Sequence, residues 1–151
     1  MNPNVLIIAL TYLSLFCLGL TVNLRGTLFP EILQTFSLTN SLGSYLFIIT
    51  SLFSILASFT SPRWLQQYDT IKIWRWGIFL MGTGAFGIFL SPQYPFLLLS
   101  GAILGLGFGI LAVTQNLLIT VVSPPTHKKR ILSGLHSMYG FAAFLSPPSV
   151  S

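Results

Sequence analysis

Residues 96–122 read FLLLSGAILGLGFGILAVTQNLLITVV and contain no Lys, Arg, Asp or Glu. A helix that crosses a bilayer needs about 20 apolar residues, so this stretch is long enough to span one. Gly101, Gly105 and Gly109 recur every fourth residue and therefore share one face of the helix. Small residues at that spacing let a neighbouring helix approach closely. We interpret the three glycines as a helix-packing face rather than a nucleotide loop, because no strand precedes them and no acidic residue lies nearby.

The composition extends this interpretation to the whole chain. Of 151 residues, 53% are hydrophobic and 6% are charged, whereas about 25% are charged in an ordinary soluble domain. So few charges cannot cover a surface that faces water. The sequence therefore predicts an all-α membrane protein whose main partner is the lipid bilayer. We assign the net charge of +5 to loops beside the membrane and not to nucleic-acid binding.

Polar segments divide the chain into four complete spans and part of a fifth. SLTNS at residues 37–41 offers capping groups for a helix start, and SPQYP at residues 91–95 interrupts a helix. The last span contains Pro147 and Pro148 and stops without a polar anchor, so we interpret residues 1–151 as an incomplete bundle from a longer reading frame. The expected spans are residues 5–29, 43–61, 73–90, 96–122 and 131–151.

Basic residues are concentrated in two expected loops, residues 62–75 and 123–130. Each loop carries three, so together they hold six of the seven Lys and Arg residues. Loops rich in Lys and Arg stay in the cytoplasm. The pattern predicts a multi-pass protein of the cell (inner) membrane, with a cytoplasmic N-terminus. Arg25, the remaining basic residue, lies at the opposite end of the first span.

Arg25 belongs to the segment NLRGTLFP, residues 23–30. A guanidinium within a span is costly unless it reaches the headgroups or finds a partner. Three interpretations stay open: it reaches the lipid headgroups, it contacts an anionic or polar ligand in a central cavity, or it joins two helices. Asn23 lies one turn from Gly19, on a narrow face that suits either a cavity or close packing.

Two further polar groups lie in apolar segments. Gln115 and Asn116 are adjacent amides in the fourth span, and such groups need hydrogen-bond partners. They either hold neighbouring helices together or contact a solute. In LHSMYG, His136 and Tyr139 are one turn apart and can face one cavity. His136 is either a structural tie or a proton-binding group.

Catalytic signatures are missing from the sequence. Glu31 and Asp69 are its only acids, and they are expected on opposite sides of the membrane. No carboxylate pair or cysteine–histidine cluster is available for acid–base or metal chemistry. We expect no enzyme activity, no cofactor and no metal site.

The segments GLTVNLRGTLFPEIL (19–33) and GLGFGILAVTQNLLI (105–119), followed by a basic loop and LHSMYG, resemble the major facilitator superfamily. Sugar-transporter-like bacterial members are the most similar in character. The resemblance covers the first four and a half helices of that fold. It implies two six-helix bundles that transport a small solute, such as a sugar, by alternating access, often with protons. It also implies that the cavity is lined by Asn23, Arg25, Gln115, Asn116, His136 and Tyr139.

The chain departs from the family pattern in three ways. Val22 stands where related sequences often carry an acid, and SPRWLQQYD keeps only Arg63 of the gating-loop motif G-x-x-x-D-R-x-G-R. The family also has about twelve spans, which implies a missing C-terminal half or a partner chain. The alternative is a small multi-span membrane protein with an assembly or regulatory role.

Overall fold

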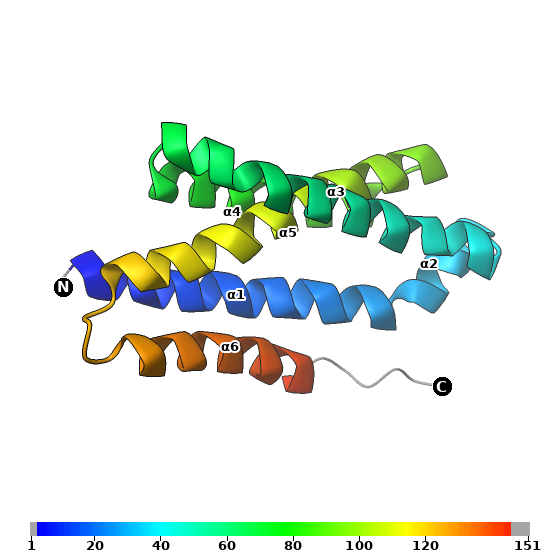
Figure 1. The fold of residues 1–151 in the computed structure, drawn as a ribbon. Coiled ribbons are helices and arrows are strands. Elements are labelled where there is room, and N and C mark those ends of the chain that lie inside the picture. The colour runs from blue at the N-terminus through cyan, green and yellow to red at the C-terminus, as the bar shows by residue number, and fades with distance from the viewer. Residues whose placement is uncertain (1–2, 146–151) are drawn as a thin grey trace. The chain divides into compact units, whose positions relative to one another are not determined.

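The computed structural model describes residues 3–145, and every regular element among them is a helix. The predicted all-α membrane fold is confirmed. Among the described residues, four helices are long and apolar enough to cross a membrane; the 18-residue α6, which overlaps the predicted fifth span, is not one of them. Pro147 and Pro148 lie outside the described residues. The helices are α1 (Pro3–Thr27), α2 (Phe29–Thr35), α3 (Asn40–Gln67), α4 (Thr70–Leu90), α5 (Tyr94–Val122) and α6 (Lys128–Leu145) (Figure 1).

The outward side chains of these helices are suited to lipid. Phe59, Phe89 and Phe144 are 78%, 84% and 85% exposed. Exposure of so much aromatic surface to water would be unfavourable, since burial of a Phe side chain stabilises by about 1.5–3 kcal/mol. Hydrocarbon removes this penalty, so the exposed apolar surface agrees with a chain that lies within the bilayer.

The first span ends earlier than the sequence analysis expected. We predicted a helix through to residue 29, but α1 ends at Thr27 and the separate helix α2 begins at Phe29. Pro30 explains the break, because proline restricts the residue before it and favours the first turn of a new helix.

The first basic segment, residues 62–75, is largely helical instead of forming a long loop, whereas the second, residues 123–130, is helical only in its last three residues. Helix α3 continues through Pro62 to Gln67, so Arg63 lies in a helix and is exposed. Helix α4 starts after Asp69, whose Oδ1 accepts a hydrogen bond of 2.7 Å from the Ile71 amide. This contact caps the N-terminal end of α4, because it satisfies a helix-end amide. Lys128 similarly begins α6.

Contacts divide the chain into two units, which we describe separately. The first unit contains residues up to Thr27 and from Thr114 onward, and the second is Leu28–Val113. Helix α5 contributes to both.

In the second unit, α5 packs against α3 through its glycine face. A Cβ atom on Gly101, Gly105 or Gly109 would meet Leu46, the Thr50 carbonyl oxygen or the Ser54 carbonyl oxygen, respectively. Both series advance by four residues along their helices, so α3 and α5 run parallel. Backbone contact this close requires glycine on α5.

Within the same unit, α4 and α5 run in opposite directions. Gly77, Gly84 and Gly87 of α4 lie against Ile110, Leu104 and Ser100, in that order. Positions on α5 decrease as those on α4 increase, so the two helices are antiparallel. The two helices therefore form a hairpin, and its turn contains the SPQYP segment.

In the first unit, α6 lies beside α1 and runs in the same direction (Figure 1). Tyr12 contacts Ile131 and Gly134, whereas Gly19, further along α1, contacts Tyr139 and Ala142. The parallel register places the basic residues 128–130 at the same end of the pair as the start of α1.

Candidate solute-binding site

A buried hydrogen bond joins α1 to the last part of α5 within the first unit. Gln115 Nε2 donates to Ser14 Oγ over 2.8 Å, and both side chains are buried. Ser14 Oγ in turn donates to the Thr11 carbonyl oxygen over 2.9 Å. This pair holds the Gln115 amide in one orientation and places it among apolar helices.

Ser14 is a residue that the sequence analysis missed. The available signal was weak: Thr11 and Ser14 are two small hydroxyl residues, three positions apart in an apolar span. Residues at that spacing share a helix face. Such side chains usually bond their own helix, as Thr11 does with the Ile7 carbonyl oxygen, so the pattern alone did not identify a partner on another helix.

The side-chain carbonyl oxygen of Gln115 remains available as a hydrogen-bond acceptor. Its Oε1 is buried and receives no hydrogen bond from a protein group among residues 3–145. A buried acceptor without a donor costs about 1–3 kcal/mol. A water molecule or a solute hydroxyl would satisfy it, so this oxygen is the clearest candidate in the site for a ligand contact.

Asn23, Arg25 and Tyr139 lie further along the α1–α6 pair. Asn23 Nδ2 donates to the Gly19 carbonyl oxygen over 2.7 Å, and a Cβ atom on Gly19 would lie 3.3 Å from Tyr139 Cδ2. The Arg25 guanidinium, which is half-buried, interacts electrostatically with Tyr139. The structure thus relates Arg25 of α1 to Tyr139 of α6, whereas the Asn23 amide bonds its own helix and lies about 200° around α1 from Arg25.

Asn116 and His136 lie apart from the buried groups. Each follows a buried residue, Gln115 or Leu135, by one position. One position is about 100° around a helix, and both side chains are exposed. His136 and Tyr139 lie about 60° apart around α6 and both are exposed, so their pairing in one cavity stays a prediction.

The charge of the first unit favours neutral polar or anionic ligands. Both acids of the chain, Glu31 and Asp69, belong to the second unit, whereas Arg25 lies in the first. In the described part of the chain, no group of three His, Cys, Asp or Glu side chains could hold a metal ion. Around Gln115 and Asn23, the ligand contacts available are hydrogen bonds and the Arg25 guanidinium.

Comparison with known proteins agrees with a transporter fold. The sequence profile of the Major Facilitator Superfamily matches residues 11–151. An efflux pump, roqT of Penicillium rubens, is 30% identical over 139 residues, which cover 90% of this chain and 25% of the relative. Bypass of stop codon protein 6 of Saccharomyces cerevisiae is 28% identical, over 88% of this chain and 27% of the relative. No solved structure matches the chain.

The fold defines a multi-pass helical membrane protein. With a profile match that covers nearly the whole chain, the protein belongs to the Major Facilitator Superfamily. It spans about a quarter of the length of the two relatives described above.

Proposed function

We propose that the chain forms the incomplete N-terminal bundle of a transporter that moves a small polar or anionic solute by alternating access. The main support is the family match together with the buried Gln115 amide, whose oxygen has no hydrogen-bond donor among the described residues. In this proposal Gln115 Oε1 accepts a hydrogen bond from the solute, and Asn23 and Arg25 of α1 and Tyr139 of α6 also contact it. Asn116 and His136 line the cavity once the remaining helices enclose it.

The rest of the transporter comes from a longer chain or a partner chain. In support, the relatives are about four times longer than the matched region. One relative is named an efflux pump, which suggests export, whereas the resemblance to sugar-transporter-like bacterial members suggests a sugar. A sugar hydroxyl suits the open oxygen of Gln115, and an anionic group suits Arg25. Proton coupling and gating by Arg63 are further parts of this proposal.

We also propose that the N-terminus lies in the cytoplasm, at the inner side of the cell membrane. We expect a reporter fused after Arg130 to be active only in the cytoplasm, because the basic start of α6 lies at the same end of the first unit as the start of α1. A fusion within the SPQYP turn should give the opposite result. Labelling of the Arg130 fusion from outside the cell would contradict this orientation.

A transport assay tests the proposed solute contacts. Cells that express the complete transporter, in which this chain is joined by the rest of its longer chain or by its partner chain, are supplied with a panel of labelled sugars and small organic anions, and flux is measured in both directions with and without a protonophore. We expect flux of one solute class, reduced about tenfold by Gln115→Leu or Arg25→Gln, because each removes one hydrogen bond to the solute.

Thr83→Ala is the matched control for these variants. Thr83 is exposed on α4, and its hydroxyl bonds only carbonyl oxygens of its own helix, so flux should be unchanged. Absence of flux for every solute, together with a stable complex between this chain and an unrelated membrane protein, would instead favour the assembly or regulatory role.

A further inference from the structure

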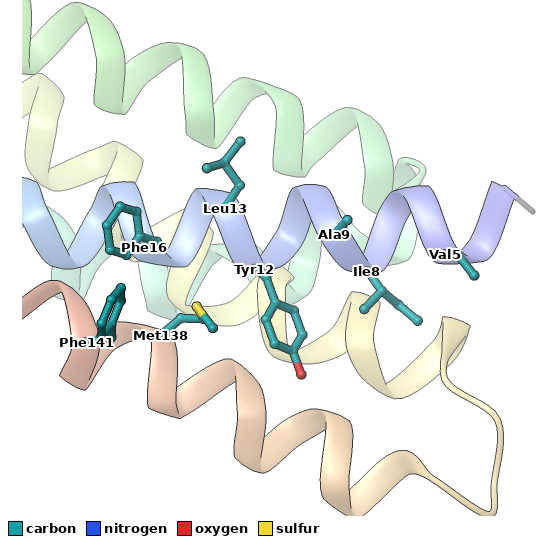
Figure 2. Close-up of a pocket in the computed structure, with 8 residues that line it drawn as sticks. All are labelled: Val5, Ile8, Ala9, Tyr12, Leu13, Phe16, Met138 and Phe141. Atoms are coloured by element: carbon teal, nitrogen blue, oxygen red, sulfur yellow. The ribbon is translucent and has the colours of Figure 1, made fainter. Parts of the chain in front are cut away.

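An apolar groove follows the seam between α1 and α6 in the first unit (Figure 2). Its volume is about 530 Å³, and it is open along one side. Phe16 and Phe141 close one end, with ring centroids 6.0 Å apart. The lining is almost wholly hydrocarbon and includes Ile8, Leu13, Phe16, Met138 and Phe141. We call this cavity the α1–α6 groove.

A second cavity, whose lining includes the polar side chains of His127 and Arg130, adjoins the groove at Tyr12. Its volume is about 480 Å³, and it is lined by Tyr12, His127, Arg130, Ile131 and Gly134. Tyr12 lines both cavities and donates a hydrogen bond to the Ile131 carbonyl oxygen, which fixes the position of its ring. On α6, the step from Gly134 to Met138 and Phe141 follows one helix face. The two cavities therefore meet at the Tyr12 side chain, on one face of α6.

The second cavity lies in a strongly cationic part of the chain. His127 and Arg130 are exposed, and Lys128 and Lys129 stand between them at the start of α6. The N-terminal end of a helix adds a partial positive charge. Residues 1–27 and 114–151 contain no Asp or Glu, so no carboxylate of this unit neutralises the site.

We propose that the α1–α6 groove and the adjoining cationic cavity bind one anionic phospholipid of the membrane. The phosphate contacts Arg130 and His127, and an acyl chain lies in the groove between Tyr12 and Phe141. A basic pocket beside a membrane-spanning helix recognises lipid headgroups in this way. A water-soluble anion would use the cationic cavity alone, and a covering apolar helix would use the groove alone; only an amphiphile fits both. This site is separate from the proposed solute contacts and does not depend on them.

The binding of lipids to the purified chain tests the proposal directly. The full 151-residue chain is purified in detergent, and bound phosphatidylglycerol and phosphatidylcholine with identical acyl chains are compared by native mass spectrometry. We expect phosphatidylglycerol to bind more tightly. Arg130→Gln should weaken its binding about fivefold, the factor for one basic residue near an anionic headgroup. Ala9→Phe, which fills the groove without a change of charge, should weaken it by a similar factor.

Lys72→Gln is the control, since it removes one positive charge from an exposed residue of the second unit. It should leave phosphatidylglycerol binding unchanged. Equal binding of the two lipids would overturn the proposal, as would equal losses in Lys72→Gln and Arg130→Gln. If inorganic phosphate displaces the lipid and Ala9→Phe has no effect, the site binds soluble anions and the proposal is also overturned.

Discussion

Gly105→Ala and Gly109→Ala should each destabilise the folded chain by about 1–3 kcal/mol, the usual cost of an overfilled interior. The new methyl group would meet the carbonyl oxygen of Thr50 or Ser54 on α3. A backbone carbonyl cannot turn aside as a side chain can, so the two helices must separate. Separation would also strain the hydrogen bond from Ser58 Oγ to the Gly109 carbonyl oxygen, now 3.2 Å. The loss of stability is measured by unfolding each variant in detergent with increasing amounts of dodecyl sulfate. Circular dichroism follows the loss of helix.

Gly82→Ala provides the control in the same unit. A Cβ atom there meets no atom within 4 Å, and alanine is a better helix former than glycine by about 1 kcal/mol. We therefore expect this variant to be as stable as the original chain or slightly more stable. If all three variants unfold alike, close contact between α3 and α5 does not hold the second unit together.

Gly19→Leu should loosen the pairing of α1 and α6 at a similar cost of about 1–3 kcal/mol. A Cβ atom at Gly19 would already lie 2.8 Å from Ala142 Cβ and 3.3 Å from Tyr139 Cδ2. The larger side chain has no space between these groups, so α6 must move away. Hydrogen–deuterium exchange of the α6 amides should rise, since separation exposes them to solvent.

The same substitution at Gly26 separates this effect from a general change in α1. Gly26 lies in the same helix, and a Cβ atom there meets nothing within 4 Å. Exchange in α6 should remain at its original level in Gly26→Leu. A rise in both variants would mean that any bulky side chain in α1 disturbs the unit, and the inferred role of the Gly19 contact would be wrong.

Much of the fold could be predicted because the bilayer imposes its requirements locally. A long uncharged stretch such as residues 96–122 must form a helix, since unpaired backbone groups are too costly in hydrocarbon. The helix breaks were harder to place. The second span was expected to end at residue 61, yet α3 continues past Pro62 to Gln67. Proline within a membrane helix is tolerated when neighbouring groups satisfy the freed carbonyl, and one sequence does not show such neighbours.

The candidate site was only partly accessible to sequence reasoning. Gln115, Asn23 and Arg25 were identified because polar groups are conspicuous in apolar spans. Ser14 was not, because a serine in a helix normally bonds its own backbone, and its partner Gln115 lies 101 positions away. The sequence also paired His136 with Tyr139; both side chains are exposed on α6, and their shared cavity stays a prediction.

The sequence by itself determined that residues 96–122 form a membrane-spanning helix with a glycine face, because the period of a helix and the solvent act on each stretch of chain separately. Only the tertiary structure decided which helix meets that face: α3 lies against Gly101, Gly105 and Gly109, and α4 lies against the remaining side at Gly107. It alone also paired α1 with α6 in parallel. Which helices pack together depends on backbone contacts between residues that are far apart in the sequence. The fit between their surfaces is a three-dimensional property that no local sequence pattern encodes.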